Sequence, residues 1–148
     1  MTVELLGGTL LGVEGVLVRV EVDVLSMLPA FAVVGLPHSS VREARERVRS
    51  AIAASELPFP RRRITANLGP ADLPKAGTGL DLPLALGVIA CSEEDGAPWD
   101  DLPLAVGELG LDGRVRPVRG VLPVVEAAAK AGCRRAIVAA ENGAEAAL

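Results

Sequence analysis

Strict alternation of apolar and polar side chains over residues 16–24 is the feature that most constrains this fold. Valine occupies every second position of this segment, and Arg19, Glu21 and Asp23 stand between the valines. Successive side chains of a strand point to opposite faces of its sheet, so the pattern is typical of a half-buried strand. The segment therefore has one face for a core and one face for solvent.

The other predicted elements surround this strand. Residues 3–11 should pair with it as an antiparallel hairpin, because residues 12–15 carry two glycines suited to a tight turn. Ser40 and Glu43 match a capping box, which predicts that the first helix begins at Ser40, and Asp81 should cap the second. Further strands are predicted at residues 30–34, 63–68, 104–109, 114–118 and 136–139. A helix is predicted from residue 40 until residues 57–60 end it, and further helices at residues 82–91, 121–131 and 141–148.

Length and charge narrow the class of protein. The chain has 148 residues, enough for a single domain at 1–148, and a formal net charge of -4. This excess of acid argues against a broad phosphate-binding surface. Aromatic residues make up only 2% of the chain, which argues against stacked bases.

The cysteines and the hydropathy suggest a reduced, membrane-free setting. Cys91, Cys133 and the lone His38 lack the spacing of a metal site, so we expect no metal and two buried, reduced thiols. No stretch reaches the roughly 18 apolar residues of a membrane span. Residues 1–8 contain no basic residue of the kind that opens a signal peptide, so a cytoplasmic location is expected.

Arginine is concentrated in two short stretches, although the chain as a whole is acidic. Arg42, Arg45, Arg47 and Arg49 lie in the first predicted helix, and the run at residues 61–63 is the densest positive charge. In the helix, Glu43 and Arg47 are four residues apart and should pair on a solvated face.

Planar guanidinium groups suit the recognition of phosphate or carboxylate. The candidate nucleic-acid or subunit contacts are Arg42, Arg45, Arg49, Arg61, Arg62 and Arg63. The alternative for the run at 61–63 is a charged strand edge that prevents pairing with other chains.

A loop rich in glycine and proline at residues 69–79 feeds the second helix. Its members Lys75, Gly77, Thr78 and Gly79 form a possible anion loop, because amides and the helix dipole would converge there. The spacing of Lys75 does not match a P-loop. The alternatives are a glycine turn without a ligand, or a peptidase site in which Lys75 activates Thr78.

Five segments of the chain carry a family resemblance: residues 28–37, 41–49, 62–73, 80–86 and 107–123. Together they resemble the amino-terminal domain of the YifB/ComM family of magnesium-chelatase-like AAA+ ATPases. The resemblance implies a Lon-protease-domain-like fold, related to domain 2 of a small-subunit ribosomal protein: α+β, two-layered, with a mixed sheet and helices packed on one face.

The resemblance also implies that the Lon catalytic pair is missing. Gly79 stands where Lon proteases have their nucleophilic serine, and Leu122 stands where they have their lysine. Glycine offers no nucleophile and leucine no base, so no catalytic residue is expected and the domain should not be proteolytic. The rivals are a protease with a relocated nucleophile such as Thr78, and a small-anion or nucleotide site at residues 77–81.

Full-length relatives are implied to continue into an ATPase module that binds ATP and Mg²⁺ and forms hexameric rings. In the ComM branch such rings are implied to drive DNA branch migration during natural transformation. This chain should then be a non-catalytic accessory domain. Its expected partners are its own ATPase module, neighbouring subunits of a ring and DNA, with no membrane.

Overall fold

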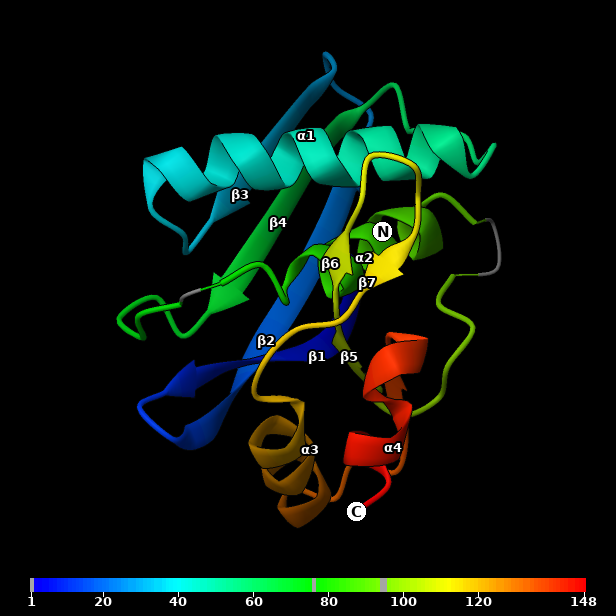
Figure 1. Ribbon diagram of the computed structural model, residues 1–148. Helices are drawn as coiled ribbons and strands as arrows, with labels where there is room; N and C mark the ends of the chain where they lie inside the picture. Colours follow the sequence, from blue (N-terminus) through cyan, green and yellow to red (C-terminus); the bar gives the residue numbers. More distant parts are fainter. Residues whose placement is uncertain (1, 76, 94–95) are drawn as a thin grey trace.

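A mixed six-stranded sheet in the order β3-β4-β2-β1-β5-β8 organises the chain (Figure 1). The computed structural model describes residues 2–75, 77–93 and 96–148. The β1–β2 and β2–β4 pairs are antiparallel, whereas β3–β4, β1–β5 and β5–β8 are parallel. The six strands are β1 (Thr2–Leu11), β2 (Glu14–Leu25), β3 (Ala30–Val34), β4 (Arg63–Gly69), β5 (Leu104–Val106) and β8 (Ala136–Val138).

The predicted hairpin is confirmed, and it forms the middle of the sheet. Leu11 of β1 faces Glu14 of β2, and Gly12 in the turn between them has a φ of +65°. That angle lies in the left-handed region, which glycine adopts without the strain that a Cβ would cause. In β2 the side chains of Val18 and Val20 are fully buried, as the alternation predicts.

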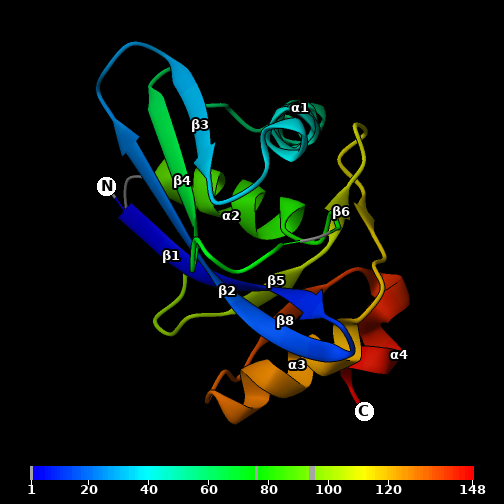
Figure 2. The same ribbon diagram turned by 90° about the vertical axis from the view of Figure 1, so that its left-hand side faces the viewer.

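Helices cover both faces of the sheet. Gly7 of β1 lies against Leu80 and Pro83 of the α2 region, whereas its neighbour Gly8 lies against Val124 of α3. Neighbouring residues of a strand face opposite sides. The expectation that all helices pack on one face is therefore wrong, because β1 and β5 contribute apolar side chains to a core on each face of the sheet. Figure 2 shows the helices on the two sides. Helices α1 (His38–Ala54) and α2 (Asp81–Cys91) lie on one side, and α3 (Val121–Lys130) lies on the other.

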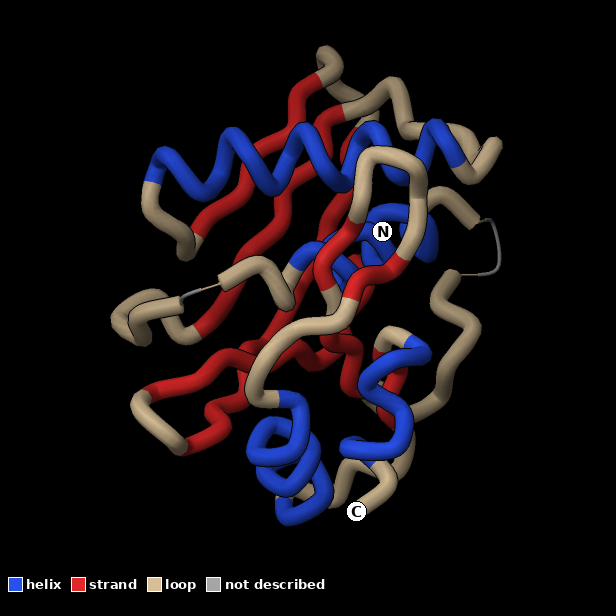
Figure 3. The backbone as a smooth tube through the Cα atoms, viewed as in Figure 1, coloured by secondary structure: helices blue, strands red, loops and turns tan. Residues whose placement is uncertain are grey.

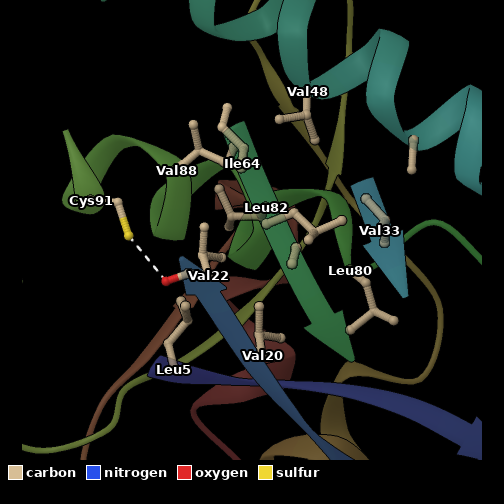
Figure 4. Packing of buried hydrophobic residues seen from close by; sticks show 14 of the residues in the cluster. Leu5, Val20, Val22, Val33, Val48, Ile64, Leu80, Leu82, Val88 and Cys91 are labelled. Carbon is tan, nitrogen blue, oxygen red and sulfur yellow. Dashed lines mark hydrogen bonds between the residues drawn. The ribbon is translucent and has the colours of Figure 1, made fainter. Parts of the chain in front are cut away.

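The larger core lies between the sheet and helices α1 and α2. Leu5, Val22, Ile64 and Val88 are fully buried within it (Figure 4). Burial of such a side chain contributes about 2 kcal/mol. The buried Cys91 closes this core, and its thiol donates a hydrogen bond to the carbonyl of Val22 at 3.1 Å.

Both predicted helix caps are wrong. Helix α1 begins at His38, before Ser40, and Pro37 occupies its N-cap position. Pro37 suits that place because proline has no amide to leave unpaired. At α2 the N-cap position belongs to Leu80, and Asp81 lies in the first turn.

The last third of the chain is more irregular than predicted (Figure 3). The strand predicted at residues 104–109 is broken at Gly107, so β5 stays in the main sheet and β6 (Glu108–Leu109) pairs with β7 (Val115–Arg116). A side chain at Gly107 would come within 2.6 Å of Val115. The terminal helix is a 3₁₀ turn, η1 (Ala140–Asn142), followed by the short α4 (Gly143–Ala146).

The connector between α2 and β5 is tied to the sheet by Trp99. Its indole N–H donates to the carbonyl of Glu4 in β1 at 3.1 Å, and its ring packs against the larger core. Residues 94–95 of this predicted connector lie outside the described residues. Among the helices that the structure describes, none is long and apolar enough to cross a membrane.

Candidate functional site

The fold brings the two arginine stretches together at the end of α1. After α1 the chain turns back through residues 57–60, which carry Arg61 and Arg62 beside Arg49 of the helix. Arg49, Arg61, Arg62 and Phe59 are among the residues that line a hollow of about 370 Å³, and Arg62 also borders a second hollow beside Glu93. We call the residues Arg49, Arg61, Arg62 and Phe59 the arginine hollow.

Aromatic contacts hold this hollow in place. The guanidinium carbon of Arg49 lies 5.2 Å from the centre of the Phe59 ring, a cation–π contact worth about 0.5–1 kcal/mol at an exposed site. The Phe59 ring in turn packs against Phe31 of β3, with ring centres 5.7 Å apart. The Phe59 ring thus positions Arg49, and Arg49, Arg61 and Arg62 are all exposed.

The other three candidate arginines lie apart from the hollow. Arg63 is on the sheet face opposite α1, because its neighbour Ile64 points into the core. Arg45 donates a hydrogen bond to the carbonyl of Phe31 at 2.9 Å, so its guanidinium group is bonded to the backbone of β3, the first strand in the sheet order. Arg42 lines a separate hollow at the start of α1, beside His38. The sequence grouped these six arginines together but could not separate their positions in space.

Lys75 is bonded to backbone carbonyls of its own loop. Its ammonium group donates to the carbonyls of Pro70 at 2.6 Å and Leu73 at 3.0 Å, and the residue is only 8% exposed. Burial lowers the pKa of this lysine, although Asp72 opposes the effect. Two of its donors thus hold the loop at residues 69–75 together, and the role of Lys75 in an anion loop stays a prediction.

The rest of the predicted anion loop borders a different hollow. Gly77, Thr78 and Gly79 line a space of about 420 Å³ together with Glu108 and Arg119. A Cβ at Gly79 would approach Val106 at 3.4 Å, an ordinary contact, so the position has room for a small side chain. Residue 76 of this loop lies outside the described residues.

Leu122, the other position of the missing Lon pair, lies in the first turn of α3. Its amide donates to the carboxylate of Glu145 at 3.0 Å. Asn142 holds the same region, since its side chain bonds both the amide and the carbonyl of Val118 at 3.1 Å. The C-terminal turn thus clamps the segment that leads into α3.

A buried ion pair between Arg47 and Asp81 was not anticipated from the sequence. The Arg47 guanidinium bonds Asp81 at 2.6 and 3.1 Å, whereas its contact with Glu43 is 3.8 Å long. Asp81 also accepts the amide of Leu109 at 3.1 Å. The pair therefore joins α1, α2 and β6. One signal was present: Asp81 is the only charged residue within residues 80–91.

Burial and hydrogen bonding act in opposite directions on the Asp81 carboxyl. Burial raises its pKa, while the hydrogen bonds from Arg47 and Leu109 lower it, and burial prevails. For Arg47, the hydrogen bond to Asp81 raises the pKa. The pair is a structural link between elements.

A hollow of about 680 Å³ lies on the face of the sheet that carries α3. Arg19, Glu21, Asp101 and Cys133 border it. Cys133 is only half-buried, so the expectation of two buried cysteines holds for Cys91 alone. Among the described residues, no three His, Cys, Asp or Glu side chains gather as a metal would require.

Comparison with known proteins places this architecture in context. Residues 20–142 match the family model described as subunit ChlI of Mg-chelatase. The chain is 44% identical over 138 residues to competence protein ComM of Haemophilus influenzae and 46% identical over 138 residues to YifB of Salmonella typhimurium, an uncharacterised protein. Each alignment covers 93% of this chain but only 27% of the relative, so the chain spans about a quarter of their length.

A weaker similarity connects the chain with a peptidase. Lon protease 2 of Bacillus subtilis is 30% identical over 73 residues, which is 49% of this chain and 13% of that protein. The α+β class with a mixed sheet agrees with this similarity.

Proposed function

Because the chain belongs to the Mg-chelatase ChlI-like family, together with ComM and YifB, we propose that it is an accessory domain of an AAA+ ATPase that processes DNA. In this proposal the domain has a Lon-like fold and contacts DNA through the arginine hollow. The ATPase module, with its ATP and Mg²⁺, would lie in the part of the relatives that this chain does not span. Ring assembly with neighbouring subunits, as a hexamer in the cytoplasm, belongs to the same proposal.

The single observation that carries the DNA role is the convergence of Arg49, Arg61 and Arg62 in one hollow. The chain has a net charge of -4, so general attraction to phosphates is weak and any contact must be local. Guanidinium forks bind phosphate oxygens through paired hydrogen bonds. A hollow with three of them is the site on this chain best suited to a DNA backbone.

Binding of forked DNA across a series of salt concentrations tests this role. The Arg49→Ala/Arg61→Ala/Arg62→Ala variant should bind more weakly, and its dependence on salt should fall by about one unit of slope for each lost phosphate contact. The matched control is Arg114→Ala/Lys130→Ala/Arg134→Ala, which removes the same charge at exposed positions elsewhere. Equal losses in both variants would mean that only net charge matters and would contradict the proposal.

We also propose that the domain does not cleave peptides. The support is the resemblance that places Gly79 and Leu122 at the Lon catalytic positions, together with the bonds of the Lys75 ammonium group to two carbonyls. The competing candidate is Thr78, which lines the hollow beside Glu108. Incubation with unfolded casein decides between them, because cleavage that is lost in Thr78→Ala would overturn the proposal.

A further inference from the structure

Among the described residues that line the arginine hollow, every charged side chain is positive. The charges are those of Arg49, Arg61 and Arg62. The other lining residues are Pro29, Ala30, Ala53, Phe59 and Pro60. Their side chains neither donate nor accept hydrogen bonds, so the guanidinium groups are the side chains that can bind a ligand in this hollow. Such a ligand is an anion.

These three arginines are not neutralised by acids of the chain, although Asp and Glu outnumber Lys and Arg by 19 to 15. Other arginines form ion pairs with an aspartate or a glutamate, namely Arg19, Arg47, Arg114 and Arg135. In the part of the chain that the structure describes, Arg49, Arg61 and Arg62 form no such pair, and Glu93 only borders the neighbouring hollow. Their positive charge is therefore available to an anion from outside.

The segment that carries Arg61 and Arg62 is fixed on both sides. Phe59 stands between two prolines, which restrict the backbone, and its ring contacts Arg49 of α1 and Phe31 of β3. On the other side, the amide of Ala30 donates to the carbonyl of Arg62 at 3.4 Å. Figure 1 shows this segment between the end of α1 and the start of β4. A hollow with restricted walls loses less entropy when it binds a ligand.

The carboxyl end of α1 also reaches the hollow, since Ala53 is one of the lining residues. Carbonyls at the end of a helix carry partial negative charge, which disfavours an anion nearby. Here the carbonyls of Ala51, Ile52 and Ala53 each accept a hydrogen bond from an amide of residues 55–57. The turn after α1 thus compensates part of this negative charge.

Two kinds of phosphate occur in a DNA strand, and they differ in charge and in shape. An internal phosphodiester carries one negative charge, and the strand leaves it on both sides. A terminal phosphate is a monoester with close to two negative charges at pH 7 and three oxygens that accept hydrogen bonds. It is attached on one side only, so it can enter a hollow end-on. Three arginines without a neutralising carboxylate match the dianion better than the single charge.

We propose that the arginine hollow binds the terminal phosphate of a DNA strand in preference to the phosphodiesters within the strand. This inference rests on the proposed DNA contact and names the chemical group that the hollow selects. Inorganic phosphate has the same chemistry, so the experiment includes it as a separate ligand.

The experiment measures the affinity for a fluorescent single strand that ends in a 5′-phosphate and for the same strand with a 5′-hydroxyl. The wild-type chain should bind the phosphorylated strand about tenfold more tightly, the effect of one additional hydrogen bond between charged groups. A 5′-hydroxyl strand two nucleotides longer has the same total charge as the phosphorylated strand. It should not show this gain in affinity.

The Arg61→Ala/Arg62→Ala variant should lose the preference for the phosphorylated strand. Both side chains are exposed, so the variant should unfold at the wild-type temperature. The matched control is Lys130→Ala/Arg134→Ala, which removes the same charge at exposed positions elsewhere and should keep the preference.

The outcomes separate this inference from the proposed function. If the wild type binds both strands equally, or if Arg61→Ala/Arg62→Ala keeps the preference, the hollow does not select a strand end although DNA contact stands. Absence of any DNA binding by the wild type would overturn both proposals. Inorganic phosphate that binds as tightly as the phosphorylated strand would assign the hollow to a free anion and overturn the selection of a strand end.

Discussion

The guanidinium of Arg47 in α1 is bonded to the carboxylate of Asp81 in α2, with Nε 2.6 Å from Oδ2 and Nη2 3.1 Å from Oδ1. The Asp81 side chain is 3% exposed and that of Arg47 is 21% exposed. Removal of one partner from a buried pair leaves an uncompensated charge. The link between the helices therefore depends on both residues.

We predict that Arg47→Met destabilises the chain by about 3 kcal/mol at neutral pH, measured by urea unfolding. The Arg47→Met/Asp81→Asn variant should recover part of that loss, because Asn keeps an oxygen for the amide of Leu109. If the double variant is less stable than the single one, the buried charge is not the cause.

The loss in Arg47→Met should also depend on pH. The variant removes a group that lowers the pKa of Asp81, so this pKa, already raised by burial, rises further. An acid with a raised pKa in the folded state favours folding below its unfolded value of about 4 and opposes folding as pH rises through the folded value. The difference in unfolding free energy between variant and wild type should be larger at about pH 8 than at about pH 4. A difference that is constant with pH would contradict this assignment.

The two thiols should react at very different rates. Burial raises the pKa of Cys91 to about 11, so its reactive thiolate is scarce near pH 8, whereas Cys133 is half-buried and borders the hollow of about 680 Å³. Iodoacetamide should modify the native chain once, and Cys133→Ala should abolish that reaction. Mass spectrometry counts the adducts, with modification in urea as the control that both thiols can react. Two rapid adducts on the native chain would show that the Cys91 pocket opens.

Close packing of α3 on β2 requires glycine at position 15. A Cβ there would lie 2.3 Å from the backbone of Pro123, which cannot rotate away. We expect Gly15→Ala to cost about 3 kcal/mol, measured by thermal unfolding. Gly143→Ala is the matched control, because no atom of the described residues lies within 4 Å of the place that its added methyl group would take, and it should be neutral or slightly stabilising. Equal effects of the two substitutions would contradict this account.

Loss of the Asn142 side chain should loosen the segment before α3. Asn142→Ala leaves the amide and carbonyl of Val118 without their side-chain partner, at a cost of about 1–3 kcal/mol. Hydrogen exchange at the amide of Val118 should accelerate, whereas the exposed Glu141→Ala should leave it unchanged. Unchanged exchange in Asn142→Ala would mean that η1 does not clamp this segment.

The sequence correctly predicted those elements that depend on residues close together in the chain. The alternation in β2, the hairpin and the strand at residues 30–34 follow from side chains within a few residues, and the structure confirms them. The placement of α3 on the opposite face of the sheet does not follow from nearby residues. Gly7 and Gly8 look equivalent in sequence, although Gly7 lies against the α2 region and Gly8 against α3. Which helix covers which face of the sheet is decided by the three-dimensional order of the strands, and a local sequence pattern does not contain that order.

The sequence likewise predicted one part of the candidate site and missed another. Arginine clusters were visible in the sequence, but their convergence at Phe59 depends on how the chain turns back after α1. Asp81 was assigned to a helix cap because its real partner, Arg47, is 34 residues away. The sequence predicts Lys75 as part of an anion loop, because the carbonyls of Pro70 and Leu73 that bind its ammonium group carry no sequence signal.

Trp99 joins the connector before β5 to the first strand through its bond with the carbonyl of Glu4. The chain has one tryptophan and no tyrosine, so this indole dominates the intrinsic fluorescence. Its emission should shift to longer wavelength as soon as the connector leaves β1 and water reaches the ring. A single optical signal, with no attached dye, therefore reports whether the centre of the sheet is intact.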